Sequence, residues 1–180
     1  MPEAGTLTAE QLLHVRMPGQ RTELIRGVLA VREPPGYRHG RVTAKVANIL
    51  TRYVEEQGLG HVLAGDTGFT LARGPDTVRA PDVAFVARER IPDPPPIGYA
   101  ELAPDLVVEV LSTGDRPGEV LAKVGDWLNA GSRLVWVVDP GREQVRVYRA
   151  DGSVAVVAAG GALEGEDVVP GFTCAPGAIF

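Results

Sequence analysis

Apolar residues recur at helical spacing in one long stretch of the chain. From Tyr37 to Gln57 they fall mostly three or four positions apart, the repeat of an amphipathic helix, and Gly58 follows as a stop signal. These apolar positions are Val42, Val46, Ile49, Leu50, Tyr53 and Val54. A short first helix is predicted near Thr8, because Thr8 and Gln11 have the spacing of a capping box.

Shorter apolar runs, separated by turn-forming residues, predict β-strands. Residues 23–25 and 28–31 flank Arg26-Gly27 and predict an N-terminal hairpin, although Arg-Gly is a weak turn signal. Near the C-terminus, Asp151-Gly152 is a stronger turn signal and predicts a second hairpin. The remaining strands, with those of the second hairpin, are expected at residues 60–64, 67–72, 79–86, 106–111, 134–138, 145–148 and 154–157.

A further helix is expected between the two most apolar strands. It should run from about residue 116 to 130, with Asp115 as its cap and Gly131 as its stop. Residues 87–104 are predicted to form a surface loop, and residues 160–180 irregular coil. Because both β-α-β and hairpin connections occur, the expected fold is α/β (α+β), with helices flanking a mixed central sheet.

Composition agrees with a single domain spanning residues 1–180. The chain is 44% hydrophobic and 23% charged, which excludes disordered and collagen-like proteins. Cys174 is the only cysteine, so a disulfide framework and a Cys-based zinc site are excluded. No apolar run approaches roughly 18 residues, and the first ten residues lack the features of a secretory signal. We therefore expect a cytoplasmic protein without a membrane partner.

Two features of the charge distribution bear on function. The formal net charge of -5 argues against a broad, non-specific nucleic-acid binder, which normally carries a basic surplus. Of the 18 basic residues, only Lys45 and Lys123 are lysines and the others are arginines. In a chain so biased toward arginine, each remaining lysine is a candidate for a specific role.

Two acidic residues interrupt apolar strands and are candidates for chemistry. Glu109 lies in the middle of the run LVVEVL, and Asp82 opens the predicted strand after Pro81. A buried carboxylate is costly unless it pairs with a cation, becomes protonated or binds a metal. A structural ion pair with an arginine is the alternative for Glu109, and simple turn formation is the alternative for Asp82.

Lys123 follows Glu109 by fourteen residues, inside the predicted helix. A short loop at residues 112–114 can turn this helix back onto the strand, and the long lysine stem can then carry the ammonium group toward Glu109. Two carboxylates and a lysine are suited to metal-assisted phosphodiester hydrolysis. A lysine on the helix surface, with its ammonium in water, is the alternative.

Several short motifs then occur in a recognisable order. They are Glu23-Leu24-Ile25-Arg26-Gly27, the region around His39, Pro81-Asp82-Val83, the segment PDLVVEVLS at residues 104–112, Lys123 with Trp127, and Trp136-Val137-Val138-Asp139-Pro140. Together, over roughly residues 8–175, they resemble the Uma2 family of bacterial endonucleases. No single motif is specific, but the ordered set is. This resemblance implies a restriction-endonuclease-like core of the PD-(D/E)xK superfamily.

The resemblance also implies roles for individual residues. Asp82 and Glu109 would be metal ligands, with the carbonyl of Val110 as a third, and the metal would be Mg²⁺ or, as a substitute, Mn²⁺. Lys123 would assist the attacking water. Glu23 would contact the metal or its waters, and His39 would line the site.

The sequence departs from the superfamily pattern at one important position. The lysine usually lies two residues after the acid on the same strand, where this chain has Leu111. In the Uma2 family the lysine has moved to the following helix, which corresponds to Lys123. Two smaller departures, Thr113-Gly114 in the loop and Trp127 in place of a tyrosine, replace no expected ligand.

The sequence therefore predicts a Mg²⁺-dependent endonuclease acting on DNA. The alternative is a catalytically inactive module of the same fold that binds nucleic acid or a protein partner. A homodimer that forms a joint DNA groove is also expected. The sequence does not distinguish DNA from RNA or duplex from single strand, and it leaves open the roles of Asp66, Asp105 and Asp139, of which the last two are most simply turn residues.

Overall fold

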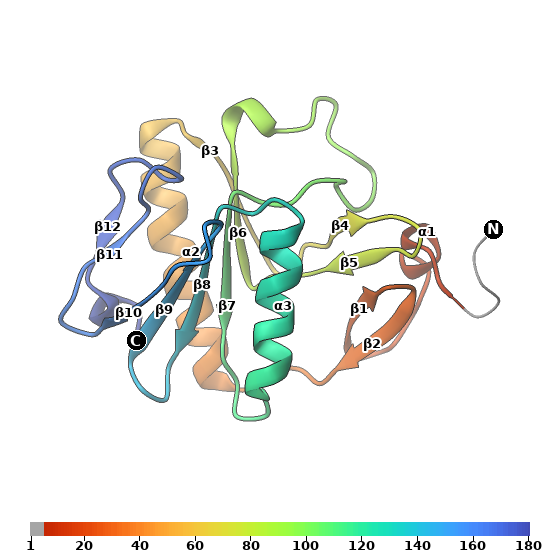
Figure 1. Ribbon diagram of the computed structural model, residues 1–180, viewed down its shortest axis with the longest axis horizontal. Helices are drawn as coiled ribbons and strands as arrows, with labels where there is room; N and C mark the ends of the chain where they lie inside the picture. The colour runs from red at the N-terminus through yellow and green to blue at the C-terminus, as the bar shows by residue number, and fades with distance from the viewer. Residues whose placement is uncertain (1–5) are drawn as a thin grey trace.

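A mixed six-stranded sheet runs through the centre of the protein (Figure 1). The computed structural model describes residues 6–180. In order across the sheet, the strands are β10 (Val154–Ala158), β9 (Gln144–Arg149), β8 (Leu134–Asp139), β7 (Leu106–Val110), β6 (Val83–Ala87) and β3 (Gly60–Ala64). β7 and β8 are parallel, and every other neighbouring pair is antiparallel. The predicted mixed sheet is thereby confirmed.

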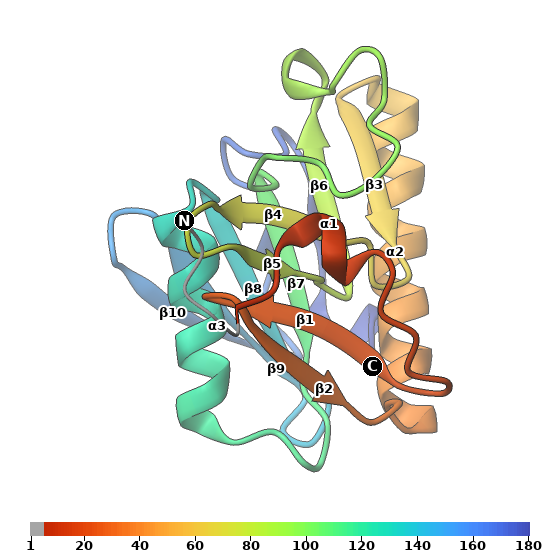
Figure 2. The same ribbon diagram turned by 90° about the vertical axis from the view of Figure 1, so that its right-hand side faces the viewer.

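The two long helices cover opposite faces of this sheet, as Figure 2 shows. They are α2 (Tyr37–Gln57) and α3 (Pro117–Asn129). Side chains alternate between the two faces along β7, so Val108 and Val110 pack on the α2 side and Val107 on the α3 side. Gly58 ends α2 in the left-handed conformation, with φ of 62°, as predicted.

A second, four-stranded sheet lies against the first and was not predicted. Its order is β2 (Val28–Arg32), β1 (Arg21–Ile25), β5 (Thr77–Arg79) and β4 (Phe69–Ala72). The predicted N-terminal hairpin is confirmed as β1 and β2, but it also pairs with β5 through Leu24 and Val78. The short helix α1 (Ala9–Leu12) packs on this sheet and begins with the predicted capping box at Thr8.

The single strand predicted at residues 79–86 is wrong. The chain leaves the small sheet after Arg79 and enters the large sheet at Val83, so that Ala80, Pro81 and Asp82 cross between the two. Pro81 has no N–H to donate to a strand partner, which favours an interruption at this point. The crossing places Asp82 where the two sheets meet.

The predicted cap of the helix after β7 is also wrong. Arg116 occupies the N-cap position without a side-chain hydrogen bond, and Pro117 begins the helix. The carboxylate of Asp115 instead accepts a hydrogen bond of 2.6 Å from the N–H of Ser112. Asp115 therefore stabilises the turn that returns the chain from β7 toward α3.

The remaining segments are short. The loop after β6 contains η1 (Arg88–Arg90), and the C-terminal tail contains β11 (Leu163–Glu164), β12 (Thr173–Cys174) and η2 (Pro176–Ala178). The tail is largely irregular, as predicted, but its apolar residues Leu163, Val169 and Phe172 are buried in the core on the α2 side of the sheet. No helix within residues 6–180 has the length and apolar character needed to cross a membrane. The prediction of no secretory signal rests partly on residues 1–5, which lie outside the described residues.

Asp76 attaches α1 to the small sheet. Its carboxylate accepts hydrogen bonds from the N–H of Ala9 at 2.8 Å and of Gly74 at 3.2 Å, and it pairs with Arg73 at 2.9 Å. Burial works against ionisation, but these backbone and guanidinium donors outweigh it and hold the pKa of Asp76 below its ordinary value. The ionised carboxylate is therefore favoured by folding.

Replacing Asp76 by alanine is expected to lower the free energy of unfolding by about 1–3 kcal/mol at pH 7, because buried N–H groups lose their acceptor. This contribution is present above the unfolded pKa of 3.8 and is lost as the pH falls through the lower folded value. Urea unfolding at pH 7 and pH 3 measures the difference, with Asp93→Ala in an exposed loop as the control. Equal stability of wild type and Asp76→Ala at pH 7 would contradict the assignment.

Candidate active site

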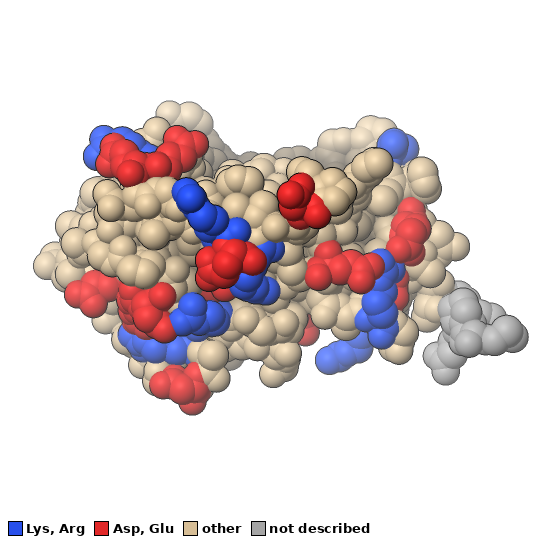
Figure 3. Space-filling view, turned by 90° about the horizontal axis from the view of Figure 1, so that it is seen from above, with Lys and Arg blue, Asp and Glu red and all other residues tan. Residues whose placement is uncertain are grey.

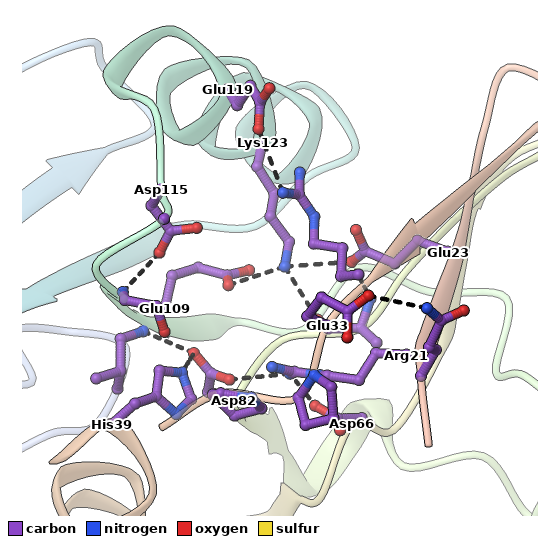
Figure 4. Close-up of a pocket in the computed structure, with 18 of the residues that line it drawn as sticks. Arg21, Glu23, Glu33, His39, Asp66, Asp82, Glu109, Asp115, Glu119 and Lys123 are labelled. Carbon is purple, nitrogen blue, oxygen red and sulfur yellow. Dashed lines mark hydrogen bonds and ion pairs between the residues drawn. The ribbon is translucent and has the colours of Figure 1, made fainter. Parts of the chain in front are cut away.

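A cavity of about 710 Å³ opens between the two sheets, at the carboxyl end of β7 and beside the start of α2 (Figure 4). Its wall includes residues from both sheets, from both long helices and from the loop between β7 and α3. The six residues to which the family resemblance gave a role all line it: Glu23, His39, Asp82, Glu109, Val110 and Lys123. Residues that are far apart in sequence therefore meet in one site.

Glu109 projects from β7 toward α3 and is 9% exposed. Its Oε2 accepts a hydrogen bond of 2.9 Å from the ammonium of Lys123, and its Oε1 accepts one of 2.8 Å from the indole N–H of Trp127. Burial raises the pKa of Glu109 to about 7; Lys123 lowers it only in part, and the charges of Asp82 and Glu23 add to the rise. Burial thus makes Glu109 easier to protonate than an ordinary glutamate.

Lys123 lies in the second turn of α3, and its side chain reaches back to the end of β7, as the sequence predicts (Figure 4). Its ammonium donates to the carbonyl of Ala80 at 3.1 Å and to Glu109, and it lies 3.2 Å from Oε1 of Glu23. Burial disfavours the charged amine, but the carboxylates of Glu109 and Glu23 outweigh it and raise the pKa of Lys123. The ammonium remains charged and is held by three oxygens.

Asp82 occupies the crossing between the sheets and is 5% exposed. Its Oδ2 accepts a 2.7 Å hydrogen bond from the N–H of Val110 and lies 3.2 Å from Nε2 of His39, while Oδ1 lies 3.0 Å from Arg21. Burial opposes ionisation, but the hydrogen bond and charge of His39 and the N–H of Val110 outweigh it and lower the pKa of Asp82. Asp82 therefore stays ionised, whereas Glu109 is easily protonated.

Glu23 joins the small sheet to the site from β1. Its Oε1 accepts a 2.9 Å hydrogen bond from the N–H of Ala80, and its Oε2 lies 2.9 Å from the guanidinium of Arg79. Burial works against ionisation, but Lys123 and Arg79 outweigh it and lower the pKa of Glu23. With its oxygens engaged in this way, Glu23 serves as a counter-ion that also positions Lys123.

His39 lies in the first turn of α2 and is 7% exposed. Its Nε2 faces Asp82, and its Nδ1 is 3.4 Å from the hydroxyl of Thr43, one helical turn later. Nε2–H donates to Asp82, and a second hydrogen bond joins Nδ1 to the Thr43 hydroxyl, so both the ring and the carboxylate are oriented. His39 therefore supports Asp82 in addition to lining the cavity.

Four residues of the site had no assigned role from the sequence: Arg21 and Arg79 were not named, Asp66 was named with its role left open, and Trp127 was named only as part of a motif. Arg79 is 3% exposed and bridges Glu23 on the small sheet to Asp126 on α3, whose Oδ2 is 2.9 Å from Nε. Arg21 pairs with both Asp66 and Asp82.

One signal for this group was available. Trp127 follows Lys123 by four residues, so both lie on one face of the helix. No local sequence pattern assigned Arg21, Asp66 or Arg79 to the site.

The remaining acidic candidates have structural roles. Asp139 accepts hydrogen bonds from the N–H groups of Gly141 at 2.9 Å and Arg142 at 3.0 Å, which is the predicted turn. Asp105 accepts one from the N–H of Ala87 at 2.9 Å and pairs with Arg90. Neither carboxylate lines the cavity.

The donor set suits a cation that retains waters. Among residues 6–180, no three Asp, Glu, His or Cys side chains are grouped to hold a metal ion. The cavity does offer the carboxylates of Asp82 and Glu109 and the main chain of Val110, and the N–H of Val110 already holds Asp82 close to the end of β7. Mg²⁺ typically takes one or two carboxylates and keeps several waters, so this oxygen-rich set is compatible with it.

The raised pKa of Glu109 predicts a pH dependence that Glu109→Gln removes. Folding favours the protonated carboxyl, so its contribution to the free energy of unfolding is fully present below pH 4.5 and is lost as the pH rises through about 7. Without added cations, the free energy of unfolding of the wild type should fall by at most about 3 kcal/mol relative to that of Glu109→Gln over this range, because one pKa unit corresponds to about 1.4 kcal/mol. Urea unfolding from pH 4.5 to 8 measures this, and parallel pH curves for the two proteins would contradict it.

The comparisons with known proteins agree with this geometry. The family described as Uma2, putative restriction endonuclease, matches residues 9–177. The crystal structure of a putative nuclease belonging to DUF820 from Anabaena variabilis ATCC 29413 is similar in fold, with a TM-score of 0.84 and 19% sequence identity over 97% of each chain. No curated protein matches the chain. The family match covers most of the sequence, and the chain belongs to the Uma2 family.

Proposed function

We propose that this protein is a metal-dependent endonuclease that hydrolyses phosphodiester bonds in DNA. The observation that carries the proposal is the convergence of Asp82, Glu109 and Lys123 in one cavity, with Lys123 only 2.9 Å from Glu109. The family description, putative restriction endonuclease, supports the same reaction class. The fold of the DUF820 protein is consistent with it.

In the proposed mechanism, Asp82, Glu109 and the carbonyl of Val110 would hold Mg²⁺, or Mn²⁺ in its place. The bound cation would polarise the phosphate and lower the pKa of its water. Glu109, whose charged form burial disfavours, would then be ionised as a ligand. His39 orients Asp82, and the indole N–H of Trp127 orients Glu109.

Lys123 is the group that acts on the reacting atoms. Its ammonium has three oxygen partners, the carbonyl of Ala80, Glu109 and Glu23. The ammonium proton that Lys123 directs at Glu109 would serve an attacking water, or the charge that develops on the phosphate. Glu23 and the Ala80 carbonyl keep the ammonium in place for this task. A compact, movable donor suits this position better than a planar guanidinium.

The direct test is cleavage of labelled DNA oligonucleotides with Mg²⁺ or Mn²⁺. Asp82→Ala, Glu109→Ala and Lys123→Ala are each expected to lower the rate at least about a hundredfold, because each removes a ligand or the cationic donor. Lys45→Ala is the matched control, since this lysine contacts the main-chain oxygen of Phe180 instead. Cleavage at the wild-type rate by Glu109→Ala would overturn the mechanism.

The alternative is an inactive module of the same fold that binds nucleic acid or a protein. The net charge of -5 and the acidic cavity are compatible with it. Such a module does not need a cation site that depends on Glu109, so calorimetric titration with Mn²⁺ separates the two functions.

The two tryptophans offer a matched pair for that titration. Trp127→Phe removes the N–H that orients Glu109, and it should weaken Mn²⁺ binding by about 10- to 100-fold. Trp136→Phe is the control, because Trp136 is equally buried and its N–H has no hydrogen-bond partner among the described residues. Equal Mn²⁺ affinities for the two variants would contradict the role of Trp127.

Three expectations remain predictions from the sequence: the single domain, the cytoplasmic location and the homodimer. One feature is relevant to the last of them. β10 forms an edge of the large sheet and exposes Val154 and Val156, at 55% and 60%. Such an edge is available for association with a second copy.

A further inference from the structure

The two candidate metal ligands lie at the bottom of the cavity. Asp82 and Glu109 are 5% and 9% exposed, and the cavity volume of about 710 Å³ is typical of a pocket that encloses one small ligand. A DNA duplex is far larger, with a major groove alone about 12 Å wide. It is also stiff, with a persistence length of about 150 base pairs. A single strand bends far more easily than a duplex, and it can therefore bring one phosphate to these carboxylates with less deformation.

The cavity is bounded on opposite sides by the two sheets. Arg32 at the end of β2 pairs with Glu119 in the first turn of α3, at 3.2 Å, and both residues line the cavity. This contact ties the hairpin to the helix beside Lys123. Pro34 and Pro35 also line the cavity and restrict the backbone there. The hairpin and the helix therefore bound the cavity on this side.

The charge of the wall does not favour a polyanionic duplex either. Among the described residues, the acidic side chains that line the cavity are Glu23, Glu33, Asp66, Asp82, Glu109, Asp115 and Glu119, and the Lys and Arg side chains are Arg21, Arg32 and Lys123. Affinity for any nucleic acid depends largely on Lys and Arg contacts to phosphates, and a duplex carries about one charge per 1.7 Å of axis, twice the density of one strand, so an acidic wall disfavours it more. Away from the cavity, the face seen from above in Figure 3 has acidic and basic side chains interspersed, without a continuous basic surface. Binding energy has to come from another interaction.

Tyr37 can supply that interaction. It begins α2, directly after Gly36 of the cavity wall and two residues before His39, and it is 90% exposed. An exposed aromatic ring this close in the chain to the cavity wall offers a stacking surface for an unpaired base. A paired base is already stacked within its duplex and is not available in the same way.

We propose that the substrate is an unpaired DNA strand, present as a free single strand, a flap or a frayed end, and that one of its bases stacks on Tyr37. The sugar-phosphate backbone of that strand then enters the cavity and approaches Asp82 and Glu109. This inference rests on the proposed nuclease function and specifies its substrate class. Arg21, which is 25% exposed at the side chain and pairs with Asp82, is the cation positioned to meet the incoming phosphate.

The test compares one labelled strand in three forms: alone, as an unpaired flap on a duplex, and fully paired in a blunt duplex, all with Mn²⁺ at one salt concentration. The free strand and the flap should be cleaved at least about tenfold faster than the blunt duplex. Faster cleavage of the blunt duplex would overturn the substrate assignment and leave the nuclease function intact. Absence of all cleavage would contradict the nuclease function instead, and the binding experiment below then decides the strand preference.

Fluorescence anisotropy with the same strand and duplex measures binding without catalysis. Tyr37→Ala should weaken single-strand binding about tenfold, whereas Tyr37→Trp should restore it, because stacking needs only an aromatic face. Val28→Ala is the matched control and should bind as wild type does, because Val28 is 64% exposed and lies at the turn end of the β1–β2 hairpin, away from the cavity. Tighter binding of the duplex than of the strand, or unchanged strand binding by Tyr37→Ala, would overturn the proposal.

Discussion

The need to balance buried charge at the end of β7 determines how the elements of this protein meet. Glu109 is almost inaccessible to water, and its charged form is stable only if cations approach it. The nearest cation, Lys123, comes from α3, and the indole N–H of Trp127 comes from the same helix face. The position of α3 on the sheet is therefore tied to the chemistry of a single carboxylate.

The same requirement connects the two sheets. Glu23 on the small sheet shares Lys123 with Glu109, and Arg79, itself buried, connects Glu23 to Asp126 on α3. Asp82 lies at the crossing between the sheets and takes its partners from α2 and β7. Because several elements supply partners to this network, loss of one partner leaves a buried charge less well compensated. The network also concentrates negative charge beside the cavity, where an added cation is electrostatically favoured.

Much of this arrangement could be read from local sequence. The helical repeat of residues 37–57, the turn at Asp151-Gly152 and the apolar strands around Glu109 are local patterns, and the structure confirms them. Glu109 stood out because an acid is costly inside an apolar strand, and Lys123 because lysine is rare in this chain. The family resemblance then added Glu23 and His39, which no local rule would have selected.

The remainder depended on contacts between distant segments. The pairing of β1 with β5 and the bridge through Arg79 join residues that are dozens of positions apart. The break at Pro81 sends adjacent residues into two different sheets. The sequence by itself determined which side chains were chemically unusual, because burial of a charge conflicts with apolar periodicity. Only the tertiary structure decided which of them share a cavity and how their pKa values separate, because proximity and desolvation arise when the two sheets and two helices pack together.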